Sequence, residues 1–248
     1  MFIDTHCHLS IEDYDDIDKV VKEDIEAGVK KLIVSACTKN TFEEALALAK
    51  KYDSIYVTLG FHPSEVDTTD ADLELLEELL KTDKVVGVGE IGLDYHYGKD
   101  DIDIQKELFE KQLILAKSNN LPVVIHSRDA VNDTIETLKK HNVKGVIHCF
   151  SGSVETADIY IRLGYKLGIG GVVTFKNSNL YKVVEHVGLD NIVLETDSPY
   201  LAPEPFRGKQ NSSKYIPVIA TKIADILNVS LSEVEKMTTK TASNLFDL

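Results

Sequence analysis

Short apolar runs alternate with longer amphipathic stretches along the whole chain. The runs are rich in Val, Ile and Leu, and most of them end at a glycine or a polar residue, which is typical of strands buried on both faces of a parallel sheet. We therefore expect eight strands, which lie near residues 2, 32, 56, 86, 124, 146, 167 and 193.

The stretches between these runs repeat their apolar residues at the spacing of an α-helix. They predict helices over residues 17–27, 41–51, 71–80, 104–117, 130–141, 154–163 and 180–187, and two more, over 216–227 and 231–245, that finish the chain. Gly28 is placed to stop the first helix, and Thr41 with Glu44 forms a candidate capping box in the second.

Strict alternation of strand and helix with short connections predicts an α/β fold, a TIM-like (β/α)8 barrel of parallel strands with C-terminal helices. Because no glycine-, serine- or proline-rich linker divides the 248 residues, we expect a single domain over residues 1–248. The alternative is an open doubly wound sheet, but no Gly-x-Gly-x-x-Gly follows the first predicted strand.

The chain carries a formal net charge of −14, and its three cysteines are widely spaced. An odd number of separated cysteines suits a reducing compartment better than a disulfide framework, so we expect a cytoplasmic location. No apolar run approaches the roughly 18 residues of a membrane span, and we expect no membrane association. The acidic balance argues against a generally basic surface that coats nucleic acid, so a polyanionic substrate would need positive charge supplied locally.

Polar residues that can bind metal follow the predicted strands. His6 and His8 are two positions apart, so an extended segment directs both side chains to one face. The carboxyl ends of barrel strands meet around one mouth, and ionisable groups buried there are costly unless they are paired or ligated. Metal ligation is therefore the economical explanation for the set that falls at this end, which comprises His6, His8, Glu90, His126, His148 and Asp197.

These residues lie in segments through which the chain resembles the TatD family of metal-dependent deoxyribonucleases, within the amidohydrolase superfamily. The matching segments follow the family order over almost the whole chain. They are Phe-Ile-Asp-Thr-His-Cys-His at 2–8, Gly-Phe-His-Pro at 60–63, Gly-Glu-Ile-Gly-Leu-Asp-Tyr at 89–95, Val-Ile-His-Ser-Arg-Asp-Ala at 124–130, Ile-His-Cys-Phe-Ser-Gly at 147–152, Leu-Glu-Thr-Asp-Ser-Pro-Tyr-Leu at 194–201 and Ala-Pro-Glu-Pro-Phe-Arg-Gly-Lys at 202–209.

The resemblance implies a TIM-like barrel, a divalent metal centre and hydrolysis of DNA phosphodiester bonds. It places one metal on His6, His8 and Asp197 and a second on His126 and His148, with Glu90 between them. One departure is visible, because many members continue Arg-Gly-Lys with Asn-Glu-Pro where this chain has Gln-Asn-Ser-Ser at 210–213. The conformation of that loop is left open.

Two-metal hydrolysis of a phosphodiester is the chemistry we expect. Glu90 would hold both ions, and Asp197 would orient the attacking water and accept its proton. Imidazole and carboxylate ligands suit two divalent ions per chain, with Zn²⁺, Mg²⁺, Mn²⁺ and Ni²⁺ all compatible. Asp4 is a candidate acceptor behind the ligands, and Asp94 either orients a ligand histidine or belongs to a turn.

For substrate contacts we expect His62, Arg128 and Arg207, with further positive charge from Lys176 and Lys209. Phe61 and Tyr95 are candidates either for base stacking or for ordinary packing. A limited cationic mouth favours a strand end over continuous duplex, so we expect a 3′–5′ exonuclease that acts on single-stranded DNA or frayed 3′ ends.

Two other functions remain open at this point. A hydrolase of the same superfamily type could cleave a C–N or ester bond in a small molecule or an aminoacyl ester with the same ligands. A binding protein could use the metal only to stabilise the barrel, in a closed site without an open water position. Nothing in the sequence requires a protein partner.

Overall fold

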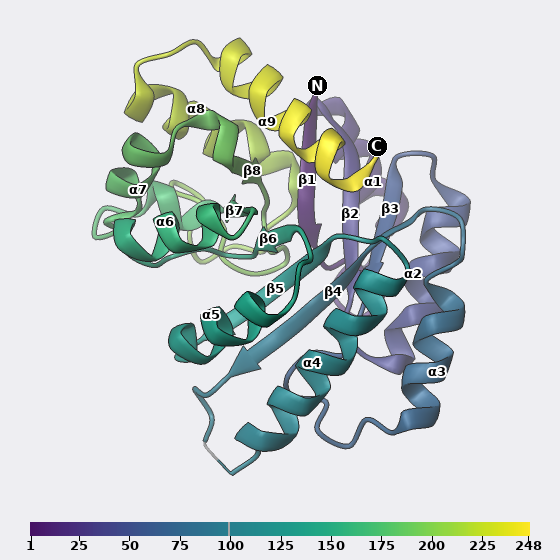
Figure 1. The fold of residues 1–248 in the computed structure, drawn as a ribbon. Helices are drawn as coiled ribbons and strands as arrows, with labels where there is room; N and C mark the ends of the chain where they lie inside the picture. The colour runs from purple at the N-terminus through teal and green to yellow at the C-terminus, as the bar shows by residue number, and fades with distance from the viewer. Residues whose placement is uncertain (99) are drawn as a thin grey trace.

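A computed structural model describes residues 1–98 and 100–248, and it contains an eight-stranded parallel sheet whose strands pair in chain order (Figure 1). The strands are β1 (Phe2–Cys7), β2 (Val29–Ala36), β3 (Ile55–Leu59), β4 (Val85–Asp94), β5 (Val123–Arg128), β6 (Gly145–Ile147), β7 (Tyr165–Ile169) and β8 (Ile192–Leu194). The segment after β8 binds the end of β1, since the backbone N–H of Asp197 donates to the carbonyl of His6 at 3.0 Å. The sheet is thus a nearly closed barrel, as the alternation predicts.

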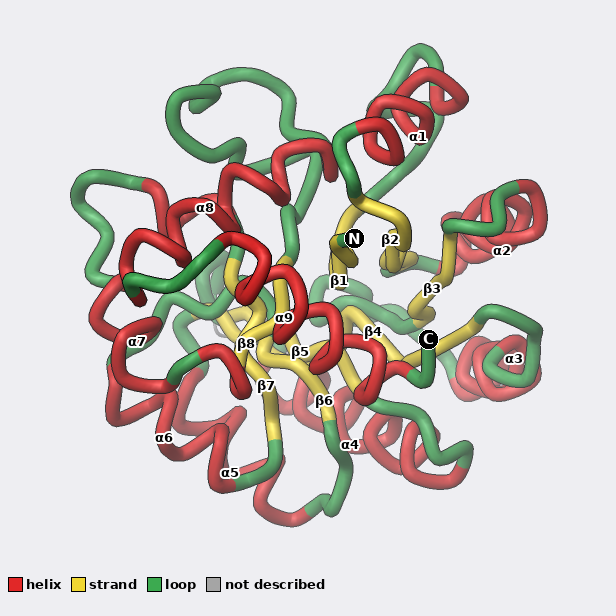
Figure 2. Tube along the Cα trace, turned by 90° about the horizontal axis from the view of Figure 1, so that it is seen from above, coloured by secondary structure: helices red, strands yellow, loops and turns green. Residues whose placement is uncertain are grey.

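Helices surround the strands as a ring in the view from above (Figure 2). They are α1 (Ile17–Glu26), α2 (Lys39–Lys51), α3 (Asp70–Leu79), α4 (Ile102–Ser118), α5 (Val131–Lys140), α6 (Val154–Arg162), α7 (Leu180–Val187), α8 (Ile216–Leu227) and α9 (Leu231–Phe246), with short 3₁₀ turns η1 (Gly171–Thr174), η2 (Leu189–Asn191) and η3 (Ser213–Tyr215). In the described part of the chain, each helix is too short or too polar to cross a bilayer.

The last helix closes one end of the barrel. Ala242 and Phe246 of α9 pack against Ile3, Val124 and Val193, which point into the barrel from three strands. Figure 2 shows α9 lying across the strands from this side. Because α9 seals the end where the strands begin, ligands can reach the barrel interior from the end where the strands finish.

The start of α2 corrects one prediction. The helix begins at Lys39, and its capping box pairs Thr38 with Thr41, whose hydroxyl oxygen accepts the backbone N–H of Thr38 at 3.2 Å. Glu44 instead accepts the backbone N–H of Ile11 at 2.8 Å and so braces the loop after β1. This long-range contact, which the local pattern does not contain, decides the role of Glu44.

Candidate metal centre

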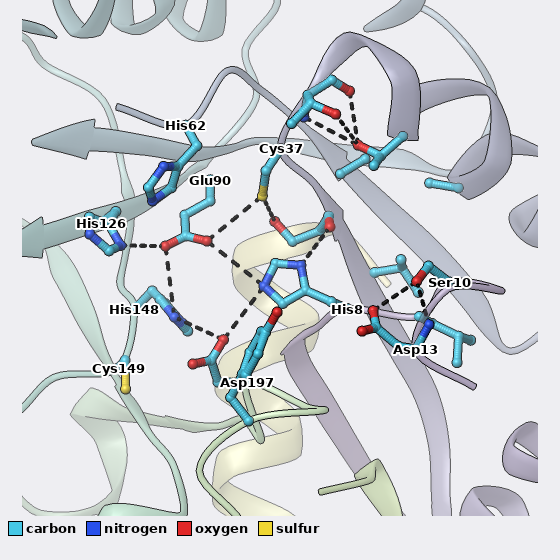
Figure 3. Close-up of a pocket in the computed structure, with 18 of the residues that line it drawn as sticks. His8, Ser10, Asp13, Cys37, His62, Glu90, His126, His148, Cys149 and Asp197 are labelled. Atoms are coloured by element: carbon cyan, nitrogen blue, oxygen red, sulfur yellow. Dashed lines mark hydrogen bonds and ion pairs between the residues drawn. The ribbon is translucent and has the colours of Figure 1, made fainter. Parts of the chain in front are cut away.

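Six predicted ligands from five strands or their following residues converge at the open end of the barrel. Glu90 lies inside β4, which runs on to Asp94 and so extends beyond the strand end expected from the sequence. Figure 3 shows Glu90 between His8 on one side and His126 and His148 on the other. The strand order brings together residues that are up to 191 positions apart in the sequence, namely His6, His8, Glu90, His126, His148 and Asp197.

The first donor group comprises His6, His8, Asp197 and one oxygen of Glu90. The Nε2 atoms of His6 and His8 lie 3.3 Å apart. Oδ1 of Asp197 lies 3.7 Å from Nε2 of His6 and 3.5 Å from Nε2 of His8. Oε2 of Glu90 lies 3.5 Å and 4.0 Å from the same two nitrogens. Two imidazole nitrogens and two carboxylate oxygens at these separations have the chemistry of a divalent-cation site.

The second donor group uses the other oxygen of Glu90. Oε1 lies 2.6 Å from Nδ1 of His126 and 3.9 Å from Nε2 of His148. Nε2 of His148 is also 3.5 Å from Oδ1 of Asp197, so this oxygen lies between the two groups. The two oxygens of Glu90 therefore face separate sets of imidazoles, which is the arrangement a bridging carboxylate needs.

Hydrogen bonds on the far side of the rings orient two of these histidines. Nδ1 of His8 lies 3.1 Å from the carbonyl oxygen of Ser35, which can only accept, so His8 donates from Nδ1 and leaves Nε2 free to ligate. Nε2–H of His126 donates to Oδ2 of Asp94 at 3.0 Å, which fixes the ring so that Nδ1 faces Glu90. Asp94 therefore orients His126, a predicted ligand, which is one of the two roles predicted for Asp94.

The carboxylates of the site stay ionised. Burial by itself raises the pKa of Glu90, but the neighbouring His148, His126 and His6 outweigh burial and hold that pKa well below its usual value. Burial and the adjacent His148 lower the pKa of His6 well below its usual value, so this ring is neutral and available as a ligand. Glu90 and His6 thus have the charge states that a divalent ion requires, whereas the neighbouring carboxylates raise the pKa of His8, His126 and His148, whose protons a bound ion would have to displace.

Asp4 holds together the segments that lie behind the predicted ligands. Its buried carboxylate accepts hydrogen bonds from the hydroxyl groups of Thr196 and Ser213, each at 2.6 Å, and from the backbone N–H of His6 at 3.2 Å. It therefore ties β1 to the segment that carries Asp197. Asp4 is thus an acceptor behind the ligands, as predicted, and its donors are hydroxyl groups and the backbone of His6.

The loop that departs from the family pattern braces the same segment. The side-chain amide of Asn211 donates to the carbonyl oxygens of Thr196 at 2.8 Å and Tyr200 at 2.6 Å. Ser212 donates to Asp24 of α1 at 2.7 Å, and Ser213 donates to Asp4. The loop whose conformation the sequence left open is thus held against β1, α1 and the segment that carries Asp197.

Glu195 is a site residue that sequence reasoning missed. Its carboxylate is fully buried, and Oε1 lies 3.1 Å from Nδ1 of His148 and accepts the backbone N–H of Cys149 at 2.5 Å. A β-carbon on Gly168 would overlap this carboxylate, so the glycine makes room for it. The available signal was an acidic residue directly after the apolar run that ends at Leu194.

A cavity of about 1040 Å³ opens above the donors. Glu90, His126, His148 and Asp197 line it together with His62 and Arg128. Arg207 lies elsewhere, with its guanidinium 4.6 Å from the ring centroid of Phe175, and its contact with substrate stays a prediction. Arg128 is the only lysine or arginine among the described residues that line the cavity.

His62 presents a hydrogen-bond donor to this cavity. The backbone N–H of Ser64 donates to Nδ1 of His62 at 3.1 Å, so the neutral ring carries its proton on Nε2. Burial lowers the pKa of His62, which favours the neutral ring. The ring stands edge-on to His126 with centroids 4.6 Å apart. This position beside the second donor group fits the predicted contact with substrate.

The two aromatic candidates for base stacking have other partners. Phe61 is buried in the core with its ring centroid 5.2 Å from that of Phe42. The hydroxyl of Tyr95 donates to Asp133 at 2.8 Å. Phe61 thus has the packing role that was its alternative.

A parallel barrel whose open end gathers imidazoles on both sides of one glutamate is the arrangement of a metal-dependent hydrolase of the TIM-barrel type. The family model described as "TatD related DNase" matches residues 3–247, and the chain belongs to the TatD family. It is 41% identical over 252 residues to the uncharacterized metal-dependent hydrolase YabD of Bacillus subtilis, with 99% of each chain covered.

Solved structures agree with this assignment. The crystal structure of YjjV, a TatD homologue from Escherichia coli K12, matches with a TM-score of 0.91 at 34% identity, covering 100% of this chain and 98% of that one. A TatD-family hydrolase from Entamoeba histolytica matches with a TM-score of 0.88 at 25% identity, covering 99% and 97%.

Proposed function

We propose that this hydrolase cleaves phosphodiester bonds of DNA and releases nucleotides from single-stranded or frayed 3′ ends. The observation that carries the proposal is the position of Glu90, whose two carboxylate oxygens each face a separate group of ligand imidazoles. The family name, which includes DNase activity, supports the choice of substrate.

Each residue then has a chemical task. Two divalent cations held by these donors would lower the pKa of a bound water and offset the negative charge that develops on the phosphoryl oxygens. Asp197 lines the cavity, and the imidazoles around it outweigh burial and hold its pKa well below the usual value, so it is a charged acceptor for the proton of the attacking water. Nε2–H of His62 and the guanidinium of Arg128 are donors for the phosphate oxygens.

The charge distribution favours a strand end over a long duplex. Among the described residues that line the cavity, Arg128 is the one lysine or arginine. The acidic residues Glu12, Asp13 and Glu44 also line it. A track of many phosphates needs many cationic partners, which makes binding strongly dependent on salt. A substrate held through one or two phosphates avoids that requirement, and we expect a shallow salt dependence.

The test is release of mononucleotides from single-stranded DNA labelled at its 5′ end. The wild-type protein with Mn²⁺ or Mg²⁺ should shorten the strand stepwise, and a chelator should stop the reaction. Glu90→Gln should lower turnover at least about 100-fold, because an amide nitrogen cannot bridge two cations. Glu185→Gln, at an exposed glutamate of α7 outside the cavity, is the matched control and should keep wild-type activity. Unchanged turnover in Glu90→Gln would rule out the bridging role.

The second candidate is hydrolysis of a C–N or ester bond in a small molecule or aminoacyl ester. The acidic wall formed by Glu12, Asp13 and Glu44 favours it, because a neutral or cationic substrate would meet no repulsion there. A panel of amides and aminoacyl esters run beside the DNA assay separates the two functions. The opening of the cavity onto Glu90 and Asp197 argues against a closed, purely structural metal site.

A further inference from the structure

Large aromatic side chains stand exposed at the mouth of the cavity. Tyr97, in the connection after β4, is 86% exposed, and Tyr200, in the connection after β8, is 59% exposed. Both line the cavity that opens onto the metal donors. Exposed aromatic rings at the entrance of a concave site commonly mark a surface that a ligand covers, since water solvates their faces poorly.

Tyr200 is fixed beside the first donor group. Its backbone N–H donates to the carbonyl of Asp197 at 2.9 Å, and its own carbonyl accepts the side-chain amide of Asn211 at 2.6 Å. Its ring lies 6.2 Å from the ring of His8 at an interplanar angle of 67°. Since hydrogen bonds hold both the N–H and the carbonyl of Tyr200, its ring can receive a flat ligand without a large loss of backbone entropy.

Tyr97 contacts Arg128, which lines the same cavity. The guanidinium of Arg128 lies over its ring, 5.4 Å from the centroid, and Nη1 of Arg128 lies 3.5 Å from the tyrosine hydroxyl. Arg128 ends β5, two residues after His126. A cation over one face of the ring leaves a flat, charged pair at the cavity rim.

We propose that Tyr200 and Tyr97 are stacking platforms for the two nucleosides that flank the scissile phosphodiester. A phosphodiester joins two nucleosides, and the cavity carries two exposed tyrosines, one against His8 of the first donor group and one against Arg128, which follows His126 by two residues. A base reaches such a ring only when it has left the duplex stack, so the platforms select unpaired ends. Every base has an aromatic face, so the selection tolerates all sequences. The inference rests on the proposed nuclease function and names how that site recognises its substrate.

The inference is tested by removing the tyrosine ring, the base or both, and comparing kcat/KM. The substrates are a short single-stranded oligonucleotide and versions with an abasic tetrahydrofuran residue at the last or the penultimate position. For the wild-type protein, loss of a stacked base should lower kcat/KM by about 5- to 150-fold. Tyr200→Ala should lower kcat/KM on the intact strand by a factor in the same range. On one of the two abasic strands, its kcat/KM should equal that of the wild-type protein. Tyr97→Ala should behave in the same way with the other abasic strand.

Three controls separate stacking from damage to the fold. Tyr200→Phe keeps the ring and should keep the wild-type rate. Tyr181→Ala removes a tyrosine that is 40% exposed on α7 and should leave all substrates unaffected. Metal content and melting temperature of both Tyr→Ala variants should match the wild type, because neither ring contributes to the donor groups.

The outcomes are distinguishable. Equal rates on intact and abasic strands, or Tyr→Ala losses that persist in full on every abasic strand, would overturn the stacking platforms while the nuclease stands. A wild-type protein that loads metal but releases no nucleotide from the intact strand would overturn the nuclease and the platforms with it.

Discussion

Replacement of Asp94 by Asn should weaken one metal site and spare the other. Both oxygens of the Asp94 carboxylate accept a hydrogen bond, one from Nε2–H of His126 at 3.0 Å and one from the backbone N–H of His96 at 2.9 Å. An asparagine has a single acceptor oxygen, so one of these bonds is lost in either amide orientation. If the amide NH₂ faces His126, it favours the tautomer with the proton on Nδ1, the atom that faces Glu90.

The size of the effect follows from this contact. Loss of the partner that orients a ligand histidine typically lowers metal affinity 10- to 100-fold, which corresponds to about 1.4 to 2.7 kcal/mol. The loss should be confined to the cation that His126 and His148 would hold. The group of His6, His8 and Asp197 lies on the other side of Glu90 and has its own orienting bond from His8 to Ser35.

The assay is a calorimetric titration of chelator-stripped protein with Mn²⁺, followed by electron paramagnetic resonance. Wild type and variant should share one binding step, and the second step should move to higher free metal concentration in Asp94→Asn. Asp129→Asn is the control, because Asp129 is an exposed neighbour that contacts His96 at 3.1 Å and not a ligand histidine. A variant in which both steps weaken equally, or neither does, would refute the orienting role.

Two further predictions concern residues behind the site. Burial raises the pKa of Asp24 from 3.8 to about 6, so between these values the folded protein keeps a proton that the unfolded chain has lost, and stability falls as pH rises through that window. Asp24→Asn should therefore be more stable than wild type at pH 8 by up to about 3 kcal/mol and nearly equal at pH 4, as measured by urea unfolding; an equal difference at both pH values would contradict the buried acid as the cause. Gly168→Ala should displace the Glu195 carboxylate from His148 and lower metal affinity about 10- to 100-fold, whereas Gly170→Ala, whose β-carbon would meet the carbonyl of Glu195 at 3.5 Å, should not. Equal metal content in the two glycine variants at limiting metal would contradict this role.

The order of the strands and the set of residues that meet at the barrel mouth could be predicted from local pattern. A strand buried on both faces has to be apolar along its length, so each strand can be recognised from a few consecutive residues. A histidine or carboxylate directly after such a run is conspicuous because it is expensive to bury, which is how His148 and Asp197 were found. Topology then places all strand ends at one mouth, so the ligands could be grouped without coordinates.

The residues behind the ligands depended on contacts that sequence distance conceals. Asp4 meets Ser213 and Thr196 across 209 and 192 positions, and Glu195 meets Cys149 across 46. In each case the local sequence around the side chain does not indicate its role, which depends on a neighbour that barrel closure brings into contact. The exposed rings of Tyr97 and Tyr200 belong to the same class, since exposure is a property of the folded surface.

The sequence by itself determined the alternation of strands and helices and the chemistry available at the strand ends, because both follow from which side chains tolerate burial. Only the tertiary structure decided which oxygen of Glu90 faces which imidazoles, which groups orient His126 and His148, and which rings stand at the mouth. Those features depend on distances between distant segments, and such distances exist only after the barrel has closed.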